Sequence, residues 1–284
     1  MNSEEIKYHT HISSEHDFFN LNLKEVWNYK DLIVLFTKRN FAVRYKQTIL
    51  GPAWLFINPI ISSLIYAFIF GGIAGIGTEG VPHILFYMTG NAIWVYFSSC
   101  VTRNASTFTS NANVFGKVYF PRLTIPISNM LTSALEFGIQ MLMVMAFLIY
   151  YLFVGAVAPN WLWWLLIPVI LLHLGIMGLG VGIIISSLTT KYRDLSILVS
   201  FGVSLWMYIT PVVYPLSQAG ESIYKTLLLW NPVTAPVEVF RYAVLGQGTI
   251  VPWALVWSWI FTIIVAVFGI MIFNKVEKTF MDTV

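Results

Sequence analysis

Long apolar runs and short polar or basic segments alternate along this chain. A helix that crosses the hydrocarbon core of a bilayer needs about 20 mostly apolar residues, and six runs approach or reach that length. They lie at about 53–75, 84–102, 127–154, 161–188, 196–216 and 253–273. The pattern predicts an all-α polytopic membrane protein with six transmembrane helices, in which a polar arm at 1–52 precedes one membrane domain at 53–273.

Composition agrees with a bilayer as the main solvent of the chain. Hydrophobic residues make up 57% of it and charged residues only 10%, whereas a soluble domain carries about 25% charged residues. The sequence has no long basic stripe, so nucleic-acid binding is not expected. Cys100 is the one cysteine and lies in an apolar run, so we expect a buried thiol rather than a disulfide framework or a metal site.

Basic residues are distributed unequally between the two sides that the spans define. With the N-terminus inside, only Lys225 and Arg241 of the 16 Lys and Arg residues fall in outer segments. The cytoplasmic segments are 1–52, 103–126, 189–195 and the tail 274–284. Because basic loops stay in the cytoplasm, both termini are expected there, and the first span is expected to act as an uncleaved anchor.

The arm contains a stretch with helical periodicity at residues 23–46. Val26, Tyr29, Ile33 and Phe36 recur at helical spacing. The basic residues of the stretch include Lys30, Lys38, Arg39, Arg44 and Lys46. This pattern predicts an amphipathic helix lying in the membrane surface, with its apolar face toward lipid and its basic residues toward anionic headgroups. The alternative is a polybasic flank that only fixes the topology.

The third predicted span carries a polar stripe. Asn129, Ser133, Glu136 and Gln140 are spaced by four, three and four residues, so they share one helical face. A carboxylate inside a membrane is costly and therefore faces protein or water. The stripe either lines a hydrated path or holds neighbouring helices together through hydrogen bonds.

Two features concern helix packing and the outer region. Gly178 and Gly182 form a GxxxG motif in the fourth span, which predicts close approach of another helix. The outer segment 217–252 is too apolar for a free loop, so it predicts short helices that dip back into the membrane. Glu238 and Arg241 lie three residues apart there and can pair across one helical turn, or form a plain ion pair on a surface helix.

The entry to the first span carries a specific resemblance. The stretch LIVLFTKRNFAVRYKQTILGPAWLFINP occupies residues 32–59, and Asn40 stands where an acidic residue is usual. The matching residues are Arg39, Arg44, Tyr45, Lys46, Leu50, Gly51, Trp54 and Pro59. Further matching stretches lie at 113–122, 231–242 and 273–284. The chain resembles type-2 ABC exporter permeases, and most of all the membrane subunit of O-antigen and capsular polysaccharide exporters (the Wzm type).

The resemblance implies a fold and a set of partners. It implies re-entrant gate helices in 217–252, a homodimer in the bacterial inner membrane, and a lipid-linked polysaccharide as substrate. It also implies a separate ABC ATPase that binds ATP and Mg. The chain itself has no P-loop motif, so we expect no enzyme activity and no cofactor of its own.

A coupling helix is implied in the cytoplasmic loop 103–126, seated on the ATPase. The candidate contacts in the two inner loops are Phe115, Lys117, Tyr119, Arg122, Lys191 and Arg193. The alternative is a basic turn that only fixes topology.

A path for sugar needs aromatic faces for stacking and small polar groups for hydrogen bonds. Besides Ser133, Glu136 and Gln140, the candidates are Tyr66, Phe70, Tyr87, Trp94, Tyr96, Phe97, Trp206, Tyr208 and Tyr214. Six spans are few for such a path, so a two-fold pair is expected to enclose it.

Other functions remain open from the sequence. A teichoic-acid, capsule or small-molecule permease of the same superfamily would show the same pattern. A membrane glycosyl- or acyltransferase would need paired acids or a His/Asp cluster, and His173 stands alone within the fourth span. The glycan, its length, and any end modification that is recognised do not follow from the sequence.

Overall fold

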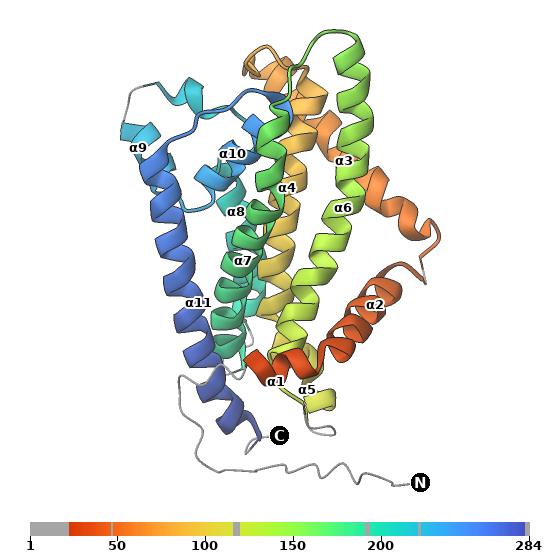
Figure 1. Cartoon of the computed structure of the whole chain (residues 1–284), viewed down its shortest axis with the longest axis vertical. Coiled ribbons are helices and arrows are strands. Elements are labelled where there is room, and N and C mark those ends of the chain that lie inside the picture. The colour runs from red at the N-terminus through yellow and green to blue at the C-terminus, as the bar shows by residue number, and fades with distance from the viewer. Residues whose placement is uncertain (1–22, 47, 116–119, 191–193, 221–222, 282–284) are drawn as a thin grey trace, which may run out of the picture.

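The structure of the chain is a computed structural model that describes residues 23–46, 48–115, 120–190, 194–220 and 223–281. Within these residues the secondary structure is helical throughout. The long helices lie side by side along the long axis of the molecule (Figure 1). The beginning of α1 and the end of α11 lie at the same end of this bundle, the lower end in Figure 1.

Five helical segments of the described chain are long and apolar enough to cross a membrane. The first joins η1 (Gly51–Ala53), α3 (Trp54–Tyr66) and η2 (Ala67–Ile73). The others are α4 (His83–Ala105), α6 (Thr124–Phe153), η3 (Trp161–Leu166) with α7 (Ile167–Thr189), and α11 (Pro252–Met281). These helical segments coincide with the first, second, third, fourth and sixth predicted spans, although α11 continues into the predicted tail.

The predicted fifth span is helical only in its first part. Helix α8 (Leu195–Tyr208) has 14 residues, which is a length of about 21 Å against a hydrocarbon core of about 30 Å. The following residues form turns up to η4 (Leu216–Ala219). Proline lacks an N–H donor and disfavours a helical residue before it, so Pro211 and Pro215 explain why the predicted helix does not reach Leu216. A count of six spans stays a prediction.

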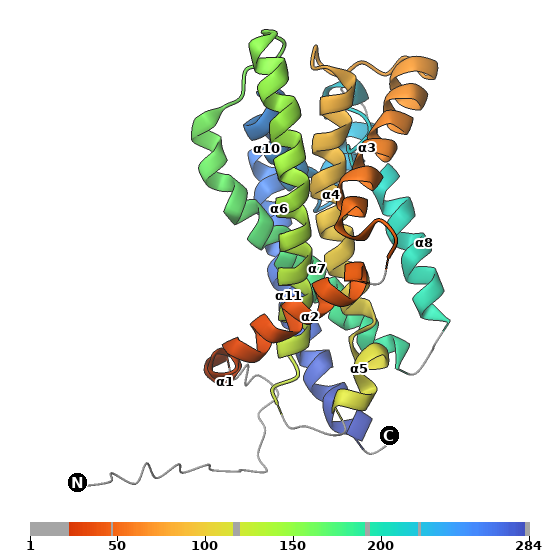
Figure 2. The same ribbon diagram turned by 90° about the vertical axis from the view of Figure 1, so that its right-hand side faces the viewer.

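The N-terminal arm forms α1 (Leu23–Asn28) and α2 (Lys30–Lys46). Helix α2 lies obliquely across the lower half of α6, and both views agree on this (Figures 1 and 2). Ile33 and Phe36 are buried, and Phe36 packs with Phe108, Phe115 and other apolar side chains at the lower end of the bundle. The prediction that this apolar face of the helix contacts lipid is therefore wrong, because protein covers it.

Helix α4 is the central helix of the bundle. It packs against α3, α6, α7, α8 and α10, and 78% of its most apolar stretch is buried. Gly178 and Gly182 of α7 face it, since a Cβ at Gly178 would lie 2.7 Å from Cys100 Cβ and one at Gly182 would lie 2.5 Å from Asn104 Cβ. The predicted role of the GxxxG motif in close packing is confirmed, and Cys100 is a buried free thiol.

A substitution of Gly182 by alanine is expected to destabilise the bundle by about 1–3 kcal/mol, because the added methyl group overpacks the contact with α4. The new Cβ would also lie 2.8 Å from the carbonyl oxygen of Val101. Thermal unfolding in detergent measures the change. Gly202→Ala is the matched control, since nothing lies within 4 Å of a Cβ at that helical position. Equal melting temperatures for the two variants would contradict the expectation.

The outer region contains α9 (Ile223–Trp230) and α10 (Thr234–Leu245), which are too short to cross a bilayer. Helix α10 is almost entirely buried against α4, α7 and α11. Glu238 and Arg241 are each 1% exposed, with Arg241 Nη1 2.6 Å from Glu238 Oε1. Their pairing is confirmed, but on a buried helix and not on a surface. Whether α9 and α10 enter the membrane stays a prediction.

Candidate functional site

Glu136, on the predicted polar stripe of α6, is the centre of a charged cluster. Its side chain is 7% exposed. Arg103, from the last turn of α4, places Nη2 2.6 Å from both carboxylate oxygens. From α2, Arg44 Nη1 lies 3.4 Å from the same two oxygens, and the Tyr45 hydroxyl donates a hydrogen bond of 3.0 Å to Oε1. One carboxylate thus joins α2, α4 and α6.

Tyr45 is a reliable donor to this carboxylate. Burial of the phenol, followed by the negative charge of Glu136, raises the pKa of Tyr45 to about 12. The hydroxyl therefore keeps its proton throughout the physiological range.

The lower part of the polar stripe holds helices together. Asn40 of α2 donates a hydrogen bond of 3.1 Å to Asn129 Oδ1, and Asn129 donates one of 3.2 Å to Asn104 Oδ1 of α4. Ser133 donates to the backbone oxygen of Asn129 within its own helix. The structural interpretation of the stripe is therefore correct for Asn129. Asn40 stands where the family that the chain resembles usually has an acidic residue. Here it links α2 to α6 through its hydrogen bond to Asn129.

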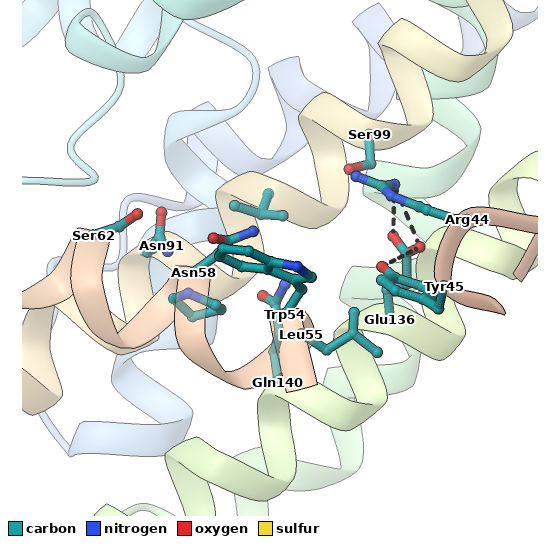
Figure 3. Close-up of a pocket in the computed structure, with 12 residues that line it drawn as sticks. Arg44, Tyr45, Trp54, Leu55, Asn58, Ser62, Asn91, Ser99, Glu136 and Gln140 are labelled. Carbon is teal, nitrogen blue, oxygen red and sulfur yellow. Dashed lines mark hydrogen bonds and ion pairs between the residues drawn. The ribbon is translucent and has the colours of Figure 1, made fainter. Parts of the chain in front are cut away.

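The upper part of the stripe lines a cavity. A cavity of about 260 Å³, lined by both polar and apolar side chains, lies between α3, α4 and α6, next to the Glu136 cluster (Figure 3). Its wall includes Glu136 and Gln140 from α6. Its other lining residues are Arg44, Tyr45, Trp54, Leu55, Asn58, Pro59, Ser62, Asn91, Val95 and Ser99. Glu136 and Gln140 therefore line this cavity and Ser133 does not, while a hydrated path along the stripe stays a prediction.

Two helices supply the remaining polar wall through regular spacing. Trp54, Asn58 and Ser62 follow one another at intervals of four along α3, and Asn91 and Ser99 lie two such intervals apart on α4. Residues four apart share a helical face, so each helix presents one polar stripe to the cavity. Each stripe is about 12 Å long at 1.5 Å per residue. The sequence analysis missed these residues, although the spacing that revealed the α6 stripe could have found them.

The predicted path aromatics lie elsewhere in the bundle. The rings of Tyr66, Phe70 and Tyr87 contact one another, and Phe97 packs edge-on against Trp206. Tyr96 is buried and donates a hydrogen bond to the backbone oxygen of Leu171. Trp94 is 4% exposed, Tyr208 is 54% exposed, and Tyr214 donates to the backbone oxygen of Tyr208. The structure does not bring these nine residues together in the cavity, and their role in a path stays a prediction.

The predicted coupling residues are only partly described. Phe115 is 3% exposed and the guanidinium of Arg122, itself 8% exposed, lies over its ring. Both side chains are thus buried and are not presented on the surface of the described chain. Lys117, Tyr119, Lys191 and Arg193 lie outside the described residues. Docking of the loop on an ATPase stays a prediction.

The contacts of His173 and the arrangement of possible metal ligands are also seen in the described residues. His173 is buried, stacks on Trp259, and its Nε2 lies 2.9 Å from the Thr262 hydroxyl and 3.2 Å from the Ser258 hydroxyl. It is a core residue with hydrogen-bond partners. Among the described residues no group of His, Cys, Asp and Glu is arranged to hold a metal ion.

Long apolar helices around a cavity with hydrogen-bonding groups are the arrangement expected of the membrane domain of a transport protein. The chain belongs to the ABC-2 type transporter family, to which residues 31–245 match. It is 33% identical over 258 residues to the O-antigen export system permease protein RfbA of Klebsiella pneumoniae, covering 89% of this chain and 94% of that protein. A second relative, the O-antigen export system permease protein RfbA of Myxococcus xanthus, is 28% identical and covers 77% and 82%. The polysialic acid transport protein KpsM of Escherichia coli is 23% identical and covers 86% and 93%.

Proposed function

We propose that this chain is the membrane subunit of an ATP-driven exporter that moves a lipid-linked, O-antigen-like polysaccharide across the bacterial inner membrane. The observation that carries the proposal is a cavity among long apolar helices whose wall presents amide, hydroxyl and carboxylate groups. The family and the three relatives support it, since each relative's name describes export or transport of a bacterial surface glycan.

The cavity meets a physical requirement of such a substrate. A sugar chain carries many hydroxyl groups, and each unpaired polar group costs several kcal/mol in hydrocarbon. Amide and hydroxyl side chains on facing helices replace water as hydrogen-bond partners. One chain has few helices for a path wide enough for a polymer, so we propose that two copies form the path about a two-fold axis.

The energy comes from a second protein in this proposal. The sequence has no P-loop motif, and members of an ABC transporter family work with an ATPase that binds ATP and Mg. The distribution of basic residues supports a cytoplasmic position for the loop 103–126 and for both termini. The loop then lies on the side where the ATPase is, and Lys117, Tyr119, Lys191 and Arg193 are the candidate contacts.

The experiment combines a deletion with a purification. In a strain that lacks this chain, the surface glycan is expected to disappear and lipid-linked glycan to accumulate in the cytoplasm, because synthesis continues without export. A tagged copy of the chain is expected to restore the surface glycan and to co-purify with a P-loop ATPase. A strain with normal surface glycan, or a tagged chain that copurifies with no ATPase, would count against the proposal. A surface tag accessible from outside at either terminus would overturn the orientation.

A further inference from the structure

Gln140 marks a binding position within the cavity. The residue is only 6% exposed, and its Oε1 has no hydrogen-bond partner among the described residues. A buried acceptor without a partner is costly, so the site is complete only when a donor from water or a ligand reaches it. Figure 3 shows the Gln140 side chain pointing from α6 toward α3, beside Trp54 and Asn58.

The groups around Gln140 are uncharged and can both donate and accept. Asn91 is 4% exposed on α4, and Asn58, Ser62 and Ser99 complete the polar wall. An amide offers two donors and one acceptor oxygen, and a hydroxyl offers one donor and two lone pairs. A ligand that itself carries several hydroxyls matches such a wall, because each of its groups both donates and accepts.

Trp54 supplies an aromatic face at the same place. Trp54 is 38% exposed. Its indole ring lies across the cavity between Asn58 and Gln140 (Figure 3). The C–H face of a pyranose ring is apolar and packs on an aromatic ring, while its hydroxyls point outward toward polar groups. Tryptophan offers the largest apolar face for such a contact, and its N–H can still reach a hydrogen-bond partner.

Charge is confined to one end of the cavity. Glu136 is the one acidic residue of the lining, and it is paired with Arg103, Arg44 and Tyr45. Toward Asn91 and Ser62 the wall is neutral. The volume of about 260 Å³ lies just below the range of drug-sized pockets, so it admits one ring and not a row of rings.

We propose that this cavity is a subsite for one uncharged sugar ring of the exported glycan, with Trp54 as the stacking platform and Asn91 and Gln140 as the groups that read its hydroxyls. The inference rests on the proposed function and adds the position and the chemical class of the sugar. In the transport cycle the subsite holds one ring of the chain next to the Glu136 cluster while neighbouring rings lie outside the cavity.

Site-specific photocrosslinking tests the position of the sugar. Benzoylphenylalanine is placed at Ser62, in the cavity wall, and at Ile65, whose side chain is 48% exposed on the same helix. Full-length protein is expressed with its ATPase in glycan-producing cells and irradiated. Capture of periodate-stainable glycan at position 62 and not at 65 is the expected result. Equal capture at both positions, or capture of lipid without sugar at 62, would overturn the proposal.

Export by conservative variants tests the chemistry. Gln140→Leu and Asn91→Leu keep the side-chain size and are each expected to lower the rate of glycan export about two- to tenfold, which is the effect of one lost hydrogen bond. Trp54→Ala is expected to have a similar effect, and Trp54→Phe is expected to retain most export. Gln247→Leu in the outer loop and Trp161→Ala, both exposed, are the matched controls. Each variant is first compared with the wild type for yield and for ATP hydrolysis by the complex.

The outcomes separate this proposal from the proposed function. If deletion of the chain abolishes surface glycan but Gln140→Leu, Asn91→Leu and Trp54→Ala export normally, the exporter assignment stands and the subsite is refuted. If deletion leaves surface glycan unchanged, the proposed function itself fails. Gln140→Glu and Asn91→Asp each add a negative charge. If these variants impair export while the leucine variants do not, the site responds to the charge of its ligand, and the proposal of an uncharged sugar ring is refuted.

Discussion

Replacing Glu136 by leucine is expected to reduce the stability of the protein by about 3–5 kcal/mol, the usual cost of breaking a buried ion pair. The reason is the charge that remains. Arg103 has a side chain only 17% exposed and makes two contacts of 2.6 Å to this carboxylate. Without Glu136 its guanidinium stays buried with no counterion, and α2 loses the contacts of Arg44 and Tyr45 with α6. Thermal unfolding in detergent and the amount of folded protein in the membrane measure the effect.

Two further variants show whether charge is the cause. Asp31→Asn removes an acidic side chain from the exposed side of α2 and is expected to change the melting temperature little. Glu136→Leu combined with Arg103→Met removes both members of the buried pair, and it is expected to recover part of the loss, because well-packed apolar residues replace buried pairs at little cost. A double variant that is no more stable than Glu136→Leu would contradict the electrostatic explanation.

Replacing Arg241 by methionine is expected to have an effect at least as large, again about 3–5 kcal/mol. Arg241 and Glu238 are both 1% exposed. Arg241 Nη2 also donates hydrogen bonds of 2.6 Å and 3.2 Å to the backbone oxygens of Pro211 and Val212. Both carbonyls lie just after the end of α8. Without Arg241 they lose their donor, so two unsatisfied buried acceptors add to the cost of leaving the Glu238 carboxylate unpaired. The expected result is a low yield of folded protein and a reduced melting temperature.

The controls for Arg241 follow the same logic. Lys38→Met removes an exposed positive charge from α2 and is expected to leave stability nearly unchanged. Glu238→Leu with Arg241→Met removes the ion pair but still leaves the two carbonyls without their donor. This double variant is therefore expected to recover less than the double variant at Glu136 and Arg103. Equal recovery would show that the contacts to Pro211 and Val212 contribute nothing.

The sequence predicted the spans because hydrophobic length is a local property. The ends of the first four spans and the start of the last fall within a few residues of the observed helices. Where tertiary contacts decide, the prediction failed. Periodicity correctly grouped Ile33 and Phe36 on one face of the arm, but it could not show that the protein, and not lipid, covers this face.

The candidate site was predicted in part for a similar reason. Glu136 and Gln140 were found because a carboxylate and an amide within an apolar span are conspicuous. The partners of Glu136 could not be found, since Arg44 and Arg103 are distant in sequence and meet it only through the packing of α2 and α4 on α6. Aromatic residues were chosen for their type, and most of those chosen pack in the core, whereas Trp54 lines the cavity.

The unequal burial of the helices has a consequence for mutational tolerance. Helix α4 packs against five other helices and has 78% of its most apolar stretch buried, while the first and last long helical segments have 17% each. A large part of the surface of those two helices requires only that a side chain be apolar, so many substitutions there leave the protein intact. On α4 the side chain at nearly every position must also fit the size and shape of the space between neighbouring helices. Random substitutions along α4 are therefore expected to inactivate the protein far more often.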